Sequence, residues 1–211
     1  MSYEKNAHFF IIKGISLFNL KKFKEAIKCF DEAIKINPLH YRAWCDKGVA
    51  LSKLGQYNEA VDCFNESLKI NPAYDMAWYN KGATLIQLKK YNDAIDCLNE
   101  SLKINPEYEK AWFKKGVALD NLEKHGKAIK CFDEAIKINP EFEDAWCNKG
   151  IDLDNLEKHG KAIKCFDEAI KINPLYFRAW YYKGAVLVEL ERLDESIECY
   201  NKALKIHKKL K

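Results

Sequence analysis

Apolar and polar positions follow the spacing of amphipathic helices along the whole chain. Between residues 44 and 54, apolar residues and one glycine recur at i, i+4, i+7 and i+10, so they share one side of a helix. After a short turn at Gly55, a second apolar stripe runs from Tyr57 to Leu68. It ends before Pro72, because proline lacks an N–H group and restricts the residue that precedes it. The pattern predicts two helices of about 14 residues each, joined by a tight turn.

This helical hairpin recurs six times with a period of 34 residues. The sequence LDNLEKHGKAIKCFDEAIKINP even occurs twice without change, at 119–140 and 153–174. A fixed period of this length is typical of solenoid proteins, in which each unit buries its apolar face against its neighbours. We therefore expect one all-α solenoid over 7–210, with a lead-in at 1–6 and no second domain. The predicted units are 7–40, 41–74, 75–108, 109–142, 143–176 and 177–210.

A glycine in the middle of each first helix indicates close packing. The six glycines are Gly14, Gly48, Gly82, Gly116, Gly150 and Gly184. Each costs about 1 kcal/mol relative to alanine in a helix. We expect this cost to be offset where the second helix approaches the glycine closely. Small residues of the second helix should provide the other half of that contact, at Ala26, Ala60, Ala94, Ala128, Ala162 and Ser196.

The repeated positions resemble a known family. A tryptophan, a glycine four residues later, a large apolar residue three further on, and then Ala, Phe, Ala and Pro are similar to the tetratricopeptide repeat (TPR) over 7–210. The resemblance implies antiparallel helix pairs in a right-handed alpha-alpha superhelix, with the first helices lining a concave groove. One departure is systematic, because lysine stands where the family usually has leucine before the glycine: Lys13, Lys47, Lys81, Lys115, Lys149 and Lys183. These lysines either cover apolar surface with their stems or form a basic ladder for an acidic partner.

Charge and hydropathy exclude several classes of protein. The formal net charge of +4 over 211 residues gives no reason to expect a nucleic-acid partner. No apolar run approaches the roughly 20 residues of a membrane span. The start, MSYEKNAHFFIIKG, lacks the order of a signal peptide. We therefore expect a cytoplasmic protein with neither a nucleic-acid nor a membrane partner.

The eight cysteines do not predict a disulfide framework. Six of them are 34 residues apart, and equivalent positions in stacked units should lie about 10 Å apart. A disulfide needs Cα atoms within about 7 Å. No Cys-x-x-Cys pair occurs, so we expect reduced, buried thiols, no metal and no cofactor. His125 and His159 stand where other units have Phe23, Tyr57 and Tyr91, and are interpreted as packing substitutes.

The positions that vary between units indicate where a partner would bind. The family resemblance places positions 2, 5 and 6 of each unit in or beside the groove. There the chain combines rings, amides and cations, which suit an extended or helical peptide. The alternative is that these are only solvated helix positions. The predicted peptide-binding residues are Tyr79, Asn80, Lys110, Phe113, Lys114, Asn148, Arg178, Tyr181 and Tyr182.

Both ends of the array are apolar, and at the C-terminal end the family usually adds a polar capping helix. Exposed apolar patches usually mark an interface. We therefore consider self-association, such as a homodimer, through Phe9, Phe10, Ile12, Ile197, Leu204 and Ile206. Against this, the charged residues that follow Leu204 could screen the end adequately.

The sequence bears on three classes of function. A non-catalytic protein-interaction scaffold agrees with six uninterrupted units and with variation gathered on one side. A self-associating assembly module is the alternative that the apolar ends favour. An enzyme is not expected, because no catalytic triad, phosphate loop or carboxylate pair stands apart from the period.

Overall fold

The computed structural model describes residues 2–209, with side chains from Asn6 onward, and every regular element in this range is an α-helix. Residue 210, the last of the predicted sixth unit, lies outside the described residues. The first helices of the six units are α1 (Ser2–Asn19), α3 (Tyr41–Lys53), α5 (Asp75–Gln87), α7 (Glu109–Asp120), α9 (Glu143–Asn155) and α11 (Phe177–Glu189). The second helices are α2 (Phe23–Ile36), α4 (Tyr57–Ile70), α6 (Tyr91–Ile104), α8 (His125–Ile138), α10 (His159–Ile172) and α12 (Leu193–Lys209). The prediction of an all-α array of helix pairs is confirmed.

The turn inside each pair is the same in all six units. One residue adopts positive φ, which is Gly55 (φ 78°) in the second unit and a lysine or glutamate in the others. The next residue then donates its N–H back to the first helix, as Gln56 does to the Leu51 carbonyl at 3.0 Å. This is the hydrogen-bond pattern of a helix C-terminus that ends in a left-handed residue.

The turn between pairs is built on Asn-Pro. Asn71 leaves the helical region (φ −134°) at the end of α4, and its side chain accepts the Ala73 N–H at 3.1 Å. The Trp78 indole N–H then donates to the Pro72 carbonyl at 2.8 Å. The equivalent tryptophans Trp44, Trp146 and Trp180 make the same bond. The repeated tryptophan is thus partly buried and also stabilises the turn that precedes it.

The mid-helix glycines receive an aromatic ring. A Cβ atom at Gly116 would lie 2.5 Å from Cε1 of Phe132, which real Cβ atoms do not tolerate. Gly14, Gly48 and Gly150 face phenylalanines in the same way, while Gly82 faces Leu98. The predicted close approach of the second helix is therefore confirmed. The group that lies nearest the glycine is a large side chain of the second helix and not mainly its small residue. The small residue of the second helix also lies close to the glycine. In the sixth repeat the Ser196 hydroxyl donates to the Gly184 carbonyl at 2.8 Å.

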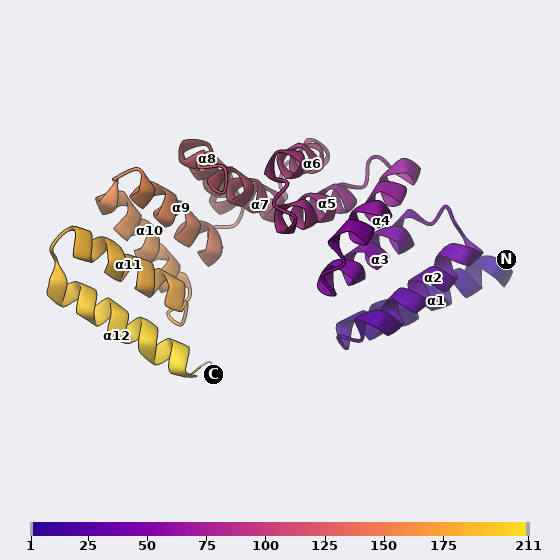
Figure 1. Ribbon diagram of the computed structural model, residues 1–211, viewed down its shortest axis with the longest axis horizontal. Coiled ribbons are helices and arrows are strands. Elements are labelled where there is room, and N and C mark those ends of the chain that lie inside the picture. Colours follow the sequence, from indigo (N-terminus) through magenta and orange to yellow (C-terminus); the bar gives the residue numbers. More distant parts are fainter. Residues whose placement is uncertain (1, 210–211) are drawn as a thin grey trace. The chain divides into compact units, whose positions relative to one another are not determined.

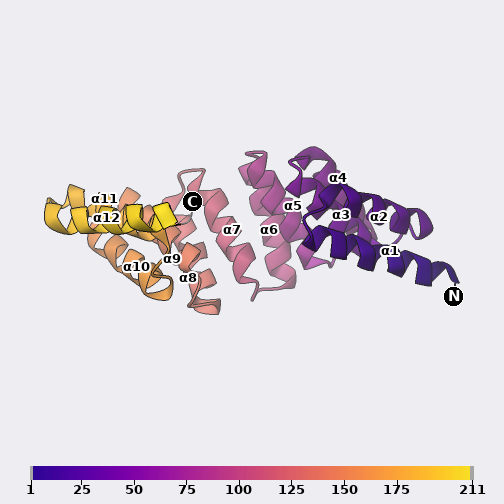
Figure 2. The ribbon, with the colours of Figure 1, turned by 90° about the horizontal axis from the view of Figure 1, so that it is seen from below.

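The six helix pairs divide into two compact units of three pairs each, which are larger than the 34-residue repeat units. The N-terminal unit is Met1–Pro106 and the C-terminal unit is Glu107–Lys211. Within each unit the two helices of a pair lie side by side (Figures 1 and 2), and each second helix packs on the next first helix. First helices also approach one another, α1 to α3 to α5 and α7 to α9 to α11, whereas no two second helices in the described part of the chain do so. The first helices therefore occupy the inner side of the curve within each unit. That the two units form one continuous domain stays a prediction.

Candidate functional site

The inner side of each unit carries the residues at positions 2 and 6 of the first helices, which we call the first-helix face. In the N-terminal unit it comprises His8, Ile12, Arg42, Asp46, Met76 and Asn80. In the C-terminal unit it comprises Lys110, Lys114, Asp144, Asn148, Arg178 and Tyr182. All of these side chains are half-buried or exposed, so they are not part of the apolar core.

In the N-terminal unit the face combines one half-buried carboxyl group with an amide and a thioether. Burial raises the pKa of the Asp46 carboxyl to about 6, although the nearby Arg42 guanidinium acts in the opposite direction. The Asn80 amide nitrogen lies 3.8 Å from Sγ of Cys45, and Tyr79 beside it is half-buried. The Tyr74 hydroxyl is directed at the sulfur of Met76, 3.7 Å away.

In the C-terminal unit the face is held by a hydrogen-bonded network. Tyr176 donates its hydroxyl to Asp144 Oδ1 at 2.5 Å, and Arg178 donates to the same hydroxyl at 3.2 Å. The Arg178 guanidinium also lies 3.8 Å from Asp144 and 5.9 Å from the ring centre of Tyr182. Asn148 donates its amide to the Asp144 carbonyl at 2.7 Å. Arg178, Asn148 and Tyr182 were predicted as binding residues, and α9 and α11 bring them together.

Tyr176 and Asp144 were missing from the predicted binding residues. Tyr176 is the last residue of its repeat unit, and it is placed against α9 only because it precedes α11 directly. Burial and the hydrogen bond to Asp144 raise the pKa of the Tyr176 hydroxyl, so it remains a donor at neutral pH. A signal was present in the sequence, since Tyr74 and Tyr108 occupy the same position in earlier units.

The remaining predicted residues of the C-terminal unit separate into two groups. Lys110 and Lys114 lie one turn apart on α7, and Lys110 is exposed. Position 5 instead lies toward the next repeat: the Phe113 ring is 4.9 Å from that of Phe142, and Cys147 is buried. Tyr181 shares this position and is 52% exposed, because no further repeat covers it in the described part of the chain. Phe113 and Tyr181 therefore belong to the surface between repeats as well as to the edge of the first-helix face.

A family model for the tetratricopeptide repeat matches six consecutive segments, at residues 10–39, 41–74, 76–108, 109–142, 143–176 and 177–210. The chain belongs to the tetratricopeptide repeat family. A search of curated protein sequences gave no match.

Solved TPR structures share the fold. MamA from Desulfovibrio magneticus RS-1 (residues 41 to the end) is 25% identical, with a TM-score of 0.74 over 81% of this chain and 97% of that one. PilF from Pseudomonas aeruginosa is 15% identical, with a TM-score of 0.84 over 94% of this chain and 90% of that one. YrrB, described as a TPR protein with an unusual peptide-binding site, is 24% identical, with a TM-score of 0.69 over 82% and 90%.

The lysine that departs from the usual TPR pattern packs against its own tryptophan. Lys47 Nζ lies 5.6 Å from the Trp44 ring centre and 2.6 Å from Asp31 of the preceding second helix. Lys149 and Lys183 pair with an aspartate at the same position, also at 2.6 Å. Where that position is asparagine, as for Lys81, the lysine still lies over its tryptophan, 5.3 Å from the ring centre. These contacts support the structural interpretation of the lysines over a basic ladder.

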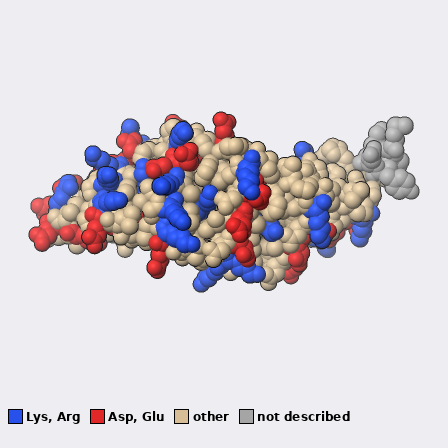
Figure 3. All heavy atoms as spheres, turned by 90° about the horizontal axis from the view of Figure 1, so that it is seen from above, with Lys and Arg blue, Asp and Glu red and all other residues tan. Residues whose placement is uncertain are grey.

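Two open hollows lie on the opposite, second-helix side of the TPR units. One of about 620 Å³ is lined by Ile27, Trp44, Lys47 and Cys63. The other, of about 750 Å³, is lined by the equivalent residues Ile129, Trp146, Lys149 and Cys165. They arise because neighbouring second helices do not approach each other. On the face drawn in Figure 3, basic and acidic side chains are interspersed over the C-terminal unit on the left.

His125 and His159, interpreted as packing substitutes, also contact carboxylates. The Nδ1 atom of His125 lies 2.8 Å from Asp152 Oδ1, and that of His159 lies 2.8 Å from Asp154 Oδ1. Both rings are therefore partners of carboxylates. The Asp-x4-His spacing in the duplicated segment was a signal for the contact of His159 with Asp154 and for the 3.4 Å approach of His125 to Asp120, because each aspartate lies at the end of the first helix near the histidine that opens the second.

The eight cysteines are free and buried, in agreement with the predicted reduced thiols. Burial raises the pKa of the Cys45 and Cys147 thiols to about 12, so they stay protonated. Among the described residues, no helix combines the length and hydropathy that crossing a membrane requires.

Four of the six apolar residues proposed for self-association are exposed. Phe9, Ile12, Ile197 and Leu204 are exposed, while Phe10 is half-buried against the core of the first pair. Ile206, expected to face nothing, is only 8% exposed. It lies two residues after Leu204, about 200° around the helix, and so points toward α11 rather than away from it.

Proposed function

We propose that this TPR chain is a non-catalytic scaffold that binds a peptide segment of a partner protein across the first-helix face. The observation that carries the proposal is the network of Asp144 on α9, Tyr176 directly before α11, and Arg178 and Tyr182 on α11. A side chain that is already ordered loses less rotamer freedom on binding. Arg178 is held by three neighbours and keeps part of its guanidinium exposed, so its remaining N–H groups can receive a carboxylate or a backbone carbonyl.

The charges of the face favour a peptide with an acidic residue. Lys110 and Lys114 lie one turn apart on α7, and Lys110 makes no ion pair within the described range. The Tyr182 ring offers an apolar surface next to Arg178. We therefore propose an extended segment with an acidic group near α7 and an apolar side chain near α11. The peptide-binding site named for YrrB supports a role of this kind but does not identify the segment.

Selection from a library of displayed 12-residue peptides tests the proposal. We expect the wild-type chain to enrich acidic peptides, and Arg178→Ala to weaken their binding at least about tenfold, as for a buried interface arginine. Arg192→Ala is the matched control, because Arg192 is exposed and pairs with Glu195 on α12. Failure to enrich any peptide, or equal loss in both variants, would overturn the proposal.

A second candidate is self-association through the apolar ends. Ile197 and Leu204 on α12 are 57% and 52% exposed. Their equivalents in the first unit, Ile27 and Ile34, pack in the core, and Ile34 lies against Ala43 of the next pair. The exposed surface of α12 thus corresponds to the surface of α2 that packs on the next helix pair. On α12, a helix of a second copy of the chain could cover this surface.

A further inference from the structure

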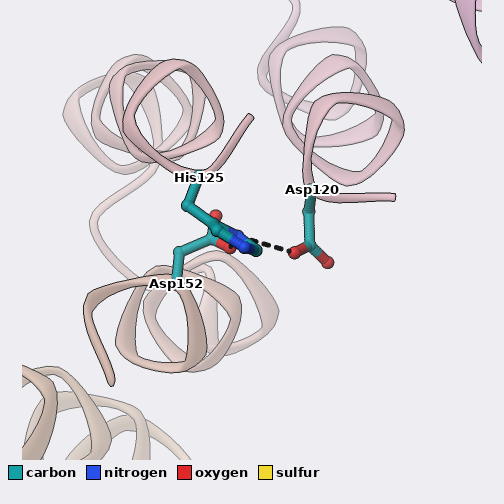
Figure 4. Close-up of side chains that lie close together, drawn as sticks. All are labelled: Asp120, His125 and Asp152. Carbon is teal, nitrogen blue, oxygen red and sulfur yellow. Dashed lines mark hydrogen bonds and ion pairs between the residues drawn. The ribbon is translucent and has the colours of Figure 1, made fainter. Parts of the chain in front are cut away.

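Two aspartates and a histidine meet where the fourth pair touches the fifth. Asp120 ends α7, His125 begins α8, and Asp152 lies in the middle of α9. The His125 Nδ1 atom is 2.8 Å from Asp152 Oδ1 and 3.4 Å from Asp120 Oδ1. Figure 4 shows the Asp120 and Asp152 carboxylates close to the imidazole ring of His125. All three helices belong to the C-terminal unit.

Asp152 is unusual because it is a carboxylate inside an apolar core. Its side chain is completely buried, and its second oxygen, Oδ2, has no hydrogen-bond partner. The same position holds Ala50, Thr84, Ala118 and Val186 in other units. A buried carboxyl oxygen without a partner costs free energy unless something compensates it. The His125 contact satisfies only one of the two oxygens, so the protein atoms alone leave the carboxylate incompletely compensated.

The spacing of the three groups suits a metal ion. Bonds of about 2.0–2.2 Å from one ion to nitrogen and oxygen ligands separate neighbouring ligand atoms by about 3.0–3.5 Å. The two separations from His125 Nδ1, 2.8 and 3.4 Å, lie close to this range. Asp120 and His125 are partly exposed, so an ion can enter from solvent and keep a water ligand. Imidazole combined with carboxylates favours a first-row transition metal over Mg²⁺ or Ca²⁺.

We propose that Asp120, His125 and Asp152 bind one divalent transition-metal ion of the Zn²⁺ type, which links α7, α8 and α9. The ion replaces the proton between His125 and Asp152, neutralises the buried carboxylate and fastens the fourth pair to the fifth. This differs from the sequence-based expectation of no metal. That expectation considered cysteine spacing, and the ligands of this site are not cysteines.

The duplicated segment provides an internal comparison. Asp154 and His159 repeat the first two ligands, with Glu189 3.6 Å from His159 Nδ1. However, Glu189 is exposed, and Val186 occupies the place of Asp152. No buried, unpartnered carboxylate oxygen is present there, so we expect one tightly bound ion rather than two.

Calorimetric titration of the metal-stripped chain with ZnCl₂ tests the site. We expect one equivalent to bind, with excess Mg²⁺ present, and to raise the melting temperature. Asp152→Asn and Asp120→Asn should each weaken binding at least about tenfold, since even groups that only orient a metal ligand contribute 10- to 100-fold. Asp154→Asn is the matched control in the other copy and should bind as the wild type does. All three variants keep the eight cysteines.

Three results would overturn the site. The first is a wild-type chain that binds no Zn²⁺ under these conditions. The second is binding that persists unchanged in Asp120→Asn, which assigns the ion to other groups such as the thiols. The third is loss in Asp154→Asn with none in Asp120→Asn, which places the ion at the second copy. Asp120 lies at a helix end and is partly exposed, so this variant decides the matter even if Asp152→Asn disturbs folding.

Discussion

One half-buried carboxyl group on the first-helix face, that of Asp46, makes the stability of the fold depend on pH. Asp46 is half-buried on α3, and burial raises the pKa of its carboxyl to about 6, above the value of an unfolded chain. The folded state therefore binds a proton more tightly than the unfolded state. Protonation of Asp46 therefore increases the free energy of unfolding as the pH falls from about 6 toward 4. Above pH 6 the carboxylate is ionised, and it lowers the free energy of unfolding by the full cost of burying its charge.

Asp46→Asn should therefore raise stability at pH 7.5, by about 1–3 kcal/mol, because it removes a poorly solvated charge. The gain should shrink when the melts are repeated at pH 4.5, where the wild-type carboxyl is already protonated when folded. Asp62→Asn on the exposed side of α4 is the control and should change little at either pH. A gain for Asp46→Asn that is the same at both pH values would contradict the assigned cause.

At the residue scale, the sequence predicted the positions that repeat and missed those that depend on stacking. The glycines, the tryptophans and six of the eight buried cysteines follow from the period alone. The contact of His125 with Asp152 does not, since the partners are in different units and meet only through the packing of α8 on α9. Tyr176 was missed for the same reason, because its partner Asp144 comes from the preceding first helix.

At the scale of the helix pair, the tight turn between its two helices restricts the sequence most clearly. Gly55 has positive φ, and nothing lies near the position of its Cβ. Gly126 in α8 also has open space around it, but its backbone is helical. The two glycines thus differ in backbone conformation and not in packing.

Replacing each glycine by alanine should give opposite results. Gly55→Ala should lower the free energy of unfolding by about 1 kcal/mol, because alanine disfavours the left-handed region. Gly126→Ala should raise it by about 0.5–1 kcal/mol, because alanine is the better helix former and restricts the unfolded chain. Urea denaturation midpoints measure both changes. Shifts in the same direction would show that the two sites do not differ as described.

At the scale of the whole molecule, the TPR array presents two kinds of surface. The first-helix faces carry polar and aromatic groups that vary between repeats. The ends carry apolar side chains whose equivalents elsewhere are covered by the next pair, as Leu68 is at 7% exposure. The family, the helix pairs and their order were predictable from the period, whereas the grouping into two compact units was not.

If the ends self-associate, the wild-type chain should sediment as a dimer or larger species at tens of micromolar. Ile197→Lys combined with Leu204→Lys should then give a monomer, because two charges replace the apolar surface of α12. Leu175→Lys is the control, as Leu175 is an equally exposed leucine in the turn before α11. A wild-type chain that is monomeric throughout this range would rule out the second candidate function and leave peptide binding unaffected.

The central claim is that a partner peptide binds the first-helix face. Lysine acetylation of the chain with and without a peptide selected by the wild type, read by mass spectrometry, tests it most directly. Lys110 and Lys114 on α7 should become protected, while the exposed Lys130 and Lys164 on α8 and α10 keep their reactivity. Protection confined to Lys130 and Lys164, beside the hollow on the second-helix side, would contradict the claim.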